Sequence, residues 1–481
     1  MSSSSESDSN SATAPSPPVT APAPVSISSH GLEAYHTHLV EAAKLATQLT
    51  QEQKDALETI ANQMARPGRG LLAADESVPT LGKRLVAAGL VNDEETRRAY
   101  REVLFGHPEM GEYLSGAILF SETLGQKAIK DPEGRLFPAL LQSKGVLPGV
   151  KVDTGLEPLG YSPRETHTTG MDDLMKRCQG FYAQGARFAK WRAVIRIDET
   201  AQLPTRACMQ INSAELARYA AVCQACGLVP IVEPEILIEG SHTAETFARV
   251  TEAALSEVYY TMAQAKVFLE GTLLKPQMVM PGVDSTPEER PTPEEAARRT
   301  LEVLRRRVPP AVPGIMFLSG GQTEEQATQN LTLINQLAKR APSSFRPSLT
   351  TCPWILSFSF GRSLQASVLA AWMGKEENYT AAVAIAGELA KANAQAQLGE
   401  YVGPHPSLLK DKSLHETNRG FYGQGVAGVA GAAASGEKEK TAEAPTEGLA
   451  EKPGEEEVGK ADIQAAVSAD ATERESSRST L

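Results

Sequence analysis

Charged residues or short glycine-containing motifs follow each of several short apolar runs, and these residues could take part in catalysis or bind a ligand. In chain order they are Asp75, Glu122, Lys151, Lys190 with Arg192, Glu233 with Glu235, Lys275, Ser319-Gly320-Gly321 and Gly361-Arg362. Unpaired charges are costly to bury in a core, so the pattern indicates one shared site rather than scattered interior positions. An inert ring of salt bridges is the alternative interpretation of the same pattern.

Lysine is the expected nucleophile, and Lys275 ends the longest of the apolar runs. An amine must lose its proton before it attacks a carbonyl, and a dry site with a cationic neighbour such as Lys190 favours the neutral amine. Glu233 and Glu235 share one face of an extended segment, because side chains alternate along a strand. Two close carboxylates can differ in protonation, so that one acts as an acid while the other pairs with lysine. A lysine that simply ends a strand is the structural alternative.

Ser319-Gly320-Gly321 and Gly361-Arg362 indicate an anion site. Glycines let backbone N–H groups approach an anion, and the helical pattern from Thr323 to Leu337 would add a favourable N-terminal dipole. The guanidinium of the second motif would supply a bidentate cation. Lys83 and Arg84 form another cationic pair that could hold a second phosphate. Alone, a Ser-Gly-Gly turn is more often only a turn.

Eight apolar runs alternate with helical patterns, and these elements would position the candidate residues. The runs cover residues 70–75, 116–120, 146–151, 188–192, 229–233, 267–275, 314–319 and 354–360. Their spacing leaves room for one strand, one helix and two loops in each unit. Continuous apolar character is typical of strands buried on both faces. We therefore predict an α/β fold, a closed (β/α)8 TIM barrel, whose strand ends meet at one mouth.

Two helices carry clear boundary signals. Thr50 followed by Gln53 predicts a capping box. Thr292-Pro293 followed by two glutamates predicts another helix start, and Arg305-Arg306-Arg307 before Pro309 predicts its end. We interpret the arginine triplet as a helix terminus, with an anion site as the alternative.

Composition narrows the class of function. The chain has 481 residues, with 47 Lys and Arg against 59 Asp and Glu, which gives a net charge of −12. An acidic protein is a poor general binder of nucleic acid, and no apolar stretch approaches the ~18 residues of a membrane span. Neither the histidines nor Cys223-x-x-Cys226 have metal-ligand spacing, so we expect no metal. The first basic residue is Lys44, so no targeting segment is expected and the predicted location is cytoplasmic.

Three regions follow from composition. Residues 1–30 are rich in Ser, Pro and Ala and are expected to be disordered. Residues 31–422 are expected to form the barrel. Residues 423–481 form an acidic tail that is also expected to be disordered.

Over about residues 45–400 the chain resembles the class I, Schiff-base fructose-bisphosphate aldolases. The resemblance rests on seven ordered segments, which are LAADES (72–77), GVKVD (149–153), FAKWR (188–192), VEPEI (232–236), LEGTLLKP (269–276), FLSGGQ (317–322) and FSFGR (358–362). Seven matching segments in the same order identify the family far more specifically than any one segment alone.

The resemblance implies reversible cleavage of fructose 1,6-bisphosphate to dihydroxyacetone phosphate and glyceraldehyde 3-phosphate, in glycolysis and gluconeogenesis. Lys275 would form the Schiff base, and Glu233 would be the general acid and base of carbinolamine dehydration. Asp75 would take the C4 hydroxyl proton, Lys190 would polarise substrate hydroxyls, and Glu235 would support the lysine network.

The resemblance also implies a substrate-binding set and an assembly. Lys151 and Arg192 would position the sugar, Ser319, Gly320, Gly361 and Arg362 would hold the C1 phosphate, and Ser77, Thr80, Lys83 and Arg84 would lie near the C6 phosphate. It further implies a metal-independent lyase without an organic cofactor, and a homotetramer.

Some positions depart from the family pattern. Phe360 and Gly125 stand where the family has tyrosine. Many members end in a tyrosine that aids proton exchange on the enamine, whereas this sequence ends in Ser-Thr-Leu, with Tyr422 as a candidate substitute. The expectation is intact cleavage with a slower or rerouted enamine protonation.

Two alternatives stay open. The first is a plastid aldolase that also cleaves sedoheptulose 1,7-bisphosphate, against which the absence of basic residues near the N-terminus argues. The second is a scaffold whose terminal segments recruit a cytoskeletal or membrane partner, against which the retained Lys275, Glu233 and Asp75 argue as the sole role.

Overall fold

A computed structural model describes residues 29–340 and 352–409, all within one compact unit. The expectations for residues 1–28, for Tyr422 and for the tail at 423–481 lie outside the described residues. Helix α1 spans Ser29–Thr47, so it begins one residue before residue 30, the expected end of the N-terminal segment. Within the described part of the chain, no helix is long and apolar enough to cross a membrane.

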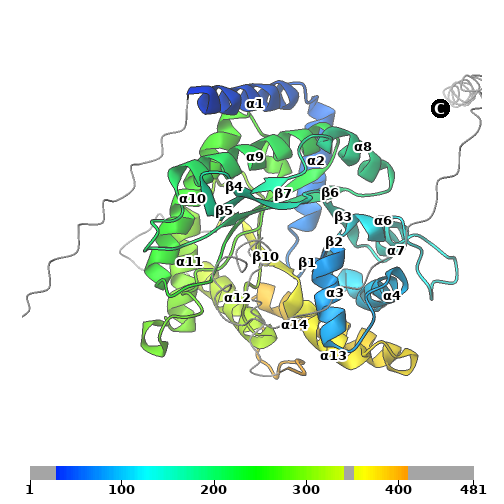
Figure 1. Cartoon of the computed structure of the whole chain (residues 1–481). Helices are drawn as coiled ribbons and strands as arrows, with labels where there is room; N and C mark the ends of the chain where they lie inside the picture. Colours follow the sequence, from blue (N-terminus) through cyan, green and yellow to red (C-terminus); the bar gives the residue numbers. More distant parts are fainter. Residues whose placement is uncertain (1–28, 341–351, 410–481) are drawn as a thin grey trace, which may run out of the picture. The chain divides into compact units, whose positions relative to one another are not determined.

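Eight parallel strands close into a barrel in the order β1-β10-β9-β8-β7-β6-β3-β2. Figure 1 shows helices packed around these strands. The strands are β1 (Gly70–Ala74), β2 (Leu114–Leu119), β3 (Leu147–Lys151), β6 (Phe188–Ile195), β7 (Val229–Ile236), β8 (Leu273–Leu274), β9 (Gly314–Phe317) and β10 (Ile355–Phe360). Each predicted apolar run contributes to one strand, so the predicted (β/α)8 barrel is confirmed.

Helices surround the barrel and connect its strands. They are α2 (Gln51–Met64), α3 (Val78–Ala87), α4 (Glu94–Phe105), α5 (Met110–Tyr113), α6 (Ser121–Leu124), α7 (Phe137–Ser143), α8 (Leu174–Ala183), α9 (Arg206–Ala225), α10 (Ala244–Gln264), α11 (Pro293–Arg307), α12 (Glu324–Lys339), α13 (Ala366–Trp372) and α14 (Tyr379–Gln397). Short 3-10 turns include η1 (Leu269–Gly271) and η4 (Arg362–Leu364).

The boundary signals read from the sequence are confirmed. Thr50 caps α2 in a capping box with Gln53, and Thr292 caps α11. At the other end of α11, Arg306 and Arg307 pair with Glu252 of α10 at 2.6 and 3.0 Å. This pairing supports the interpretation of the arginine triplet as a helix terminus.

The run at residues 267–275 was expected to be the longest strand, and this expectation is wrong. Only Leu273–Leu274 is a strand, and η1 precedes it. The Gln224 amide on α9 donates to the carbonyls of Phe268 and Gly271 at 2.7 and 3.1 Å and accepts from the Phe268 N–H at 3.1 Å. These bonds hold the backbone to a helix side chain instead of a neighbouring strand.

A second sheet was not expected from the sequence. The antiparallel hairpin of β4 (Gly155–Leu159) and β5 (Ser162–Thr169) follows β3 and does not join the barrel. Its segments are polar and half exposed, so they lack the continuous apolar character of the barrel strands.

The barrel interior is packed with apolar side chains at its N-terminal end. Phe188, Ile231, Leu273 and Met316 form a buried cluster with Leu57, Ala61 and Met64 of α2, which covers this end. Position 149 next to the Phe188 ring requires glycine, because a Cβ at Gly149 would lie 2.2 Å from that ring. The packed end leaves the carboxyl ends of the strands as the place for a site.

Candidate active site

The carboxyl ends of the strands enclose a cavity of about 590 Å³. Its described lining includes every catalytic and substrate-binding residue that the family resemblance implied, namely Asp75, Ser77, Thr80, Lys83, Arg84, Lys151, Lys190, Arg192, Glu233, Glu235, Lys275, Ser319, Gly320, Gly361 and Arg362. Residues up to 287 positions apart are therefore brought to one mouth, as a parallel barrel requires.

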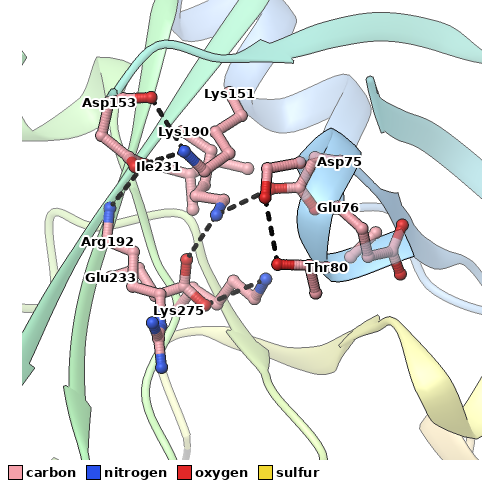
Figure 2. Close-up of polar contacts among 12 residues, drawn as sticks. Asp75, Glu76, Thr80, Lys151, Asp153, Lys190, Arg192, Ile231, Glu233 and Lys275 are labelled. Atoms are coloured by element: carbon pink, nitrogen blue, oxygen red, sulfur yellow. Dashed lines mark hydrogen bonds and ion pairs between the residues drawn. The ribbon is translucent and has the colours of Figure 1, made fainter. Parts of the chain in front are cut away.

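Four buried side chains form a row of alternating charge across the cavity floor (Figure 2). Lys275 Nζ lies 3.1 Å from Glu233 Oε1, and Glu233 Oε2 lies 3.2 Å from Lys190 Nζ. Lys190 Nζ lies 2.7 Å from Asp75 Oδ2. Glu233 and Lys190 lie within β7 and β6, whereas Lys275 and Asp75 directly follow β8 and β1. The row places one carboxylate in contact with both lysines.

The charges in this row fix the protonation of Asp75 and Lys190. Burial alone would raise the pKa of Asp75, but the attraction of Lys190 and Lys275 outweighs burial and lowers that pKa to about 2. Burial alone would lower the pKa of Lys190, but Asp75 and Glu233 raise it. At neutral pH, Asp75 is therefore a carboxylate and Lys190 an ammonium.

A second group of ion pairs lies beside the row. The Lys151 ammonium contacts the Asp153 carboxylate and donates to the Asp153 carbonyl at 2.8 Å (Figure 2). The Arg192 guanidinium pairs with Glu235, while the backbone N–H of Arg192 donates to the Asp153 carboxylate at 3.4 Å. Burial would lower the pKa of Arg192, but Glu235 raises it. The sequence predictions assigned no role to Asp153, although it lies only two positions after Lys151, the last residue of β3.

Glu76 organises the side of the cavity that faces α3. Its carboxylate lies 2.6 Å from Arg84, 2.9 Å from Arg101 and 2.9 Å from the Gln365 amide nitrogen. Burial would raise the pKa of Glu76, but Arg101 and Arg84 lower it. Glu76 and Arg101 were also absent from the predicted site, because Arg101 comes from α4 and no local pattern connects the two.

The two glycine-containing motifs lie next to each other because β9 pairs with β10. After β9, the Gln322 N–H donates to the Ser319 carbonyl at 2.9 Å and closes a turn. A Cβ added at Gly320 would lie 1.9 Å from the Gln277 amide, so the Gln277 side chain would have to move. The turn leads into α12, and Gly361 leads into η4. Both backbone segments reach the cavity, as an anion site would require.

One strand-end charge does not join the cavity. Glu122 lies in α6 and binds Arg97 of α4 through two hydrogen bonds of 2.9 and 2.6 Å. The short helix that follows β2 turns this side chain away from the mouth, so the expectation that every strand end contributes is wrong here.

The cavity is positively charged overall and has no evident metal site. Its described lining carries seven cationic and four anionic side chains. In the ranges that the structure describes, no group of three or more His, Cys, Asp or Glu side chains is arranged to hold a metal ion. The arrangement offers a buried amine, an adjacent carboxylate to exchange its proton, and cations for anionic groups.

Comparison with known proteins gives one consistent result. A family model described as fructose-bisphosphate aldolase class-I matches residues 56–421. The fructose-bisphosphate aldolase of Schistosoma mansoni is 48% identical over 374 residues, which cover 78% of this chain and 98% of that protein. The cytosolic fructose-bisphosphate aldolase 5 of Arabidopsis thaliana is 50% identical over 349 residues, which cover 73% of this chain and 92% of that protein.

A solved structure agrees with these relatives. The fructose-bisphosphate aldolase of Plasmodium falciparum, in complex with TRAP and a small-molecule inhibitor, is 44% identical to this chain with a TM-score of 0.69. The match covers 74% of this chain and 98% of that one.

Proposed function

The chain belongs to the class I fructose-bisphosphate aldolases, and we propose that the cavity described above cleaves fructose 1,6-bisphosphate through a Schiff base on Lys275. The family makes the protein an aldolase, a carbon–carbon lyase of glycolysis. The observation that carries the assignment of the site is the buried contact between Lys275 and Glu233, 3.1 Å apart, within a row that also holds Lys190 and Asp75.

Schiff-base formation uses the Lys275–Glu233 pair. Glu233 accepts a proton from Lys275, and the neutral amine attacks the C2 carbonyl of the open-chain sugar to form a carbinolamine. Glu233 then returns a proton to the C2 hydroxyl, which leaves as water and gives a protonated imine. Because Glu233 also lies 3.2 Å from Lys190, a cation stays beside it throughout this exchange.

Cleavage of the C3–C4 bond uses Asp75. Since its pKa is about 2, Asp75 is ionised at neutral pH and can accept the proton of the C4 hydroxyl. The C4 oxygen then forms a carbonyl, the C3–C4 electron pair moves into the protonated imine, and glyceraldehyde 3-phosphate leaves. The enamine on Lys275 regains a proton at C3, and hydrolysis releases dihydroxyacetone phosphate.

The remaining lining residues bind and orient the substrate in this proposal. The C1 phosphate is held by Ser319, Gly320, Gly361 and Arg362, the C6 phosphate lies near Ser77, Thr80, Lys83 and Arg84, and Lys151, Arg192 and Glu235 orient the sugar. Their positions around one cavity support this assignment.

Borohydride trapping with dihydroxyacetone phosphate tests the proposal. Peptide mass mapping should find one reduced adduct, on Lys275, in the full-length protein. The Lys275→Met variant should give no adduct, whereas Lys391→Met, which replaces an exposed lysine of α14, should behave like the wild type. A folded wild-type protein without an adduct, or with an adduct on another lysine, would refute the Schiff-base assignment.

Further properties are part of the proposal. The protonated imine is itself the electron sink, so we expect no need for a metal or an organic cofactor, and cleavage should be unaffected by EDTA. The cytosolic and cytoplasmic relatives of Arabidopsis thaliana and Pisum sativum support a cytoplasmic location. The prediction of a homotetramer is based on the family resemblance, and analytical ultracentrifugation tests it. Action on sedoheptulose 1,7-bisphosphate and binding of a cytoskeletal partner stay predictions.

A further inference from the structure

One buried carboxylate joins the N-termini of α12 and α13. Glu324 is the first residue of α12 and is 1% exposed. Its Oε1 accepts a hydrogen bond from the Ser367 N–H at 3.0 Å, and its Oε2 accepts from the hydroxyls of Ser367 and, at 2.5 Å, Ser407. Among the described residues, no lysine or arginine pairs with it, so these three donors must compensate for its burial.

Such a carboxylate is a costly way to fill a core. A carboxyl group buried without a cation is less favourable than a well-packed apolar side chain of similar volume. Its place in the fold gives a reason for it. Glu324 follows Ser319 by five positions and Ser367 follows Arg362 by five, so the carboxylate connects the segments directly behind the two proposed phosphate-binding loops.

The chain after α14 covers this connection. The Leu408 N–H donates to Ser367 Oγ at 2.8 Å, and the Ser407 N–H donates to His405 Nδ1 at 3.1 Å. The other ring nitrogen of His405 lies 3.0 Å from Thr328 Oγ1 of α12. Residues 405–408 therefore shield the carboxylate and supply one of its donors.

We propose that Glu324 is a positioning residue, which fixes the loop at Ser319–Gly321 relative to the loop at Gly361–Arg362 and so sets the spacing of the C1 phosphate grip. Neither Glu324, Ser367 nor Ser407 lines the described cavity, so the effect is indirect. The proposal rests on the proposed function of these two loops.

Trapping with two ketones separates a phosphate-specific effect from a general loss of structure. Dihydroxyacetone phosphate carries the phosphate that the loops would hold, and dihydroxyacetone lacks it. In the full-length Glu324→Gln and Ser367→Ala variants, half-maximal trapping should need about tenfold more dihydroxyacetone phosphate, within the ~10²-fold that a displacement of about 1 Å can cost. Trapping of dihydroxyacetone should stay within about twofold of the wild type, because the Lys275 chemistry is untouched.

Matched variants make the result specific. Thr332→Val removes a buried hydroxyl of α12 that bonds within its own helix, and it should match the wild type with both ketones. The Glu324→Gln/Ser367→Ala double variant should be no worse than the weaker-binding single variant, because both changes alter the same hydrogen bond between the Ser367 hydroxyl and Glu324. Ser407→Ala keeps the Ser367 contacts and should have a smaller effect.

Three outcomes would overturn the proposal. Glu324→Gln with a wild-type requirement for dihydroxyacetone phosphate would refute the positioning role, as would equal losses with both ketones or a full effect from Ser407→Ala alone. No adduct in the wild type would instead refute the proposed function of the cavity, so the two failures can be told apart. If Glu324→Gln does not fold, Ser367→Ala carries the test.

Discussion

Replacing Asp75 with asparagine should weaken the dependence of stability on pH in the acid range. The lysine charges lower the pKa of Asp75 from an ordinary 3.8 to about 2, so the folded protein holds this carboxylate ionised where the unfolded chain would bind a proton. A depressed pKa contributes stability that is present above the unfolded value near 4 and is lost as the pH falls through the folded value near 2.

The expected size follows from the shift. At about 1.4 kcal/mol for each pKa unit, the difference of nearly two units corresponds to about 2 kcal/mol of unfolding free energy. Asp75 is 8% exposed, so water screens its contact with Lys190 only weakly. Asparagine resembles a protonated aspartate in size and lacks its charge, so Asp75→Asn should lose this contribution at every pH.

Urea unfolding between pH 6 and pH 2, at constant ionic strength, measures the effect. The stability difference between the wild type and Asp75→Asn should shrink by about 2 kcal/mol as the pH falls. Asp284→Asn, at an exposed position, controls for the loss of one carboxylate. A difference that stays constant, or that grows toward acid, would show that Lys190 and Lys275 do not hold Asp75 in its ionised form.

Three further predictions concern single contacts. Lys190→Met removes the nearest cation from Asp75, so the pKa of Asp75 should rise and the acid loss of stability should begin at a higher pH in the same urea experiment. Gly149→Ala should destabilise the protein by about 1–3 kcal/mol in urea unfolding, because the new Cβ would overlap the Phe188 ring; Gly160→Ala, where a Cβ meets nothing within 4 Å, is the control and should change little. Thr50→Ala removes the cap of α2 and should cost about 1 kcal/mol by thermal or urea unfolding, whereas Thr50→Ser should restore most of it.

Much of the barrel could be predicted because its strands are buried on both faces. Continuous apolar runs such as residues 229–233 and 314–319 are visible without any knowledge of the fold, and their ends carry the polar residues of the mouth. The topology then brings these ends together, so the charged strand-end residues other than Glu122 line one cavity.

The rest depends on contacts between distant segments. The bonds from Gln224 to Phe268 and Gly271 shorten β8, and nothing near residue 270 reveals a partner on α9. The same holds for Glu76, which follows β1 and pairs with Arg101 on α4, and for Glu122, which a short helix turns toward Arg97. Side-chain pairing across elements is thus the part of the site that local sequence patterns do not encode.

The seven cationic and four anionic side chains of the cavity stand within a chain whose net charge is −12. A doubly phosphorylated sugar is therefore repelled by most of the protein and attracted by its mouth. Such a contrast focuses the electric field on one entrance and raises the rate of productive encounter. Dissolved salt would screen both the repulsion by the acidic chain and the attraction by the mouth, while leaving the buried row of charges largely unaffected. Rising ionic strength should thus change the rate at which dilute substrate is captured before it changes the rate of the chemical step.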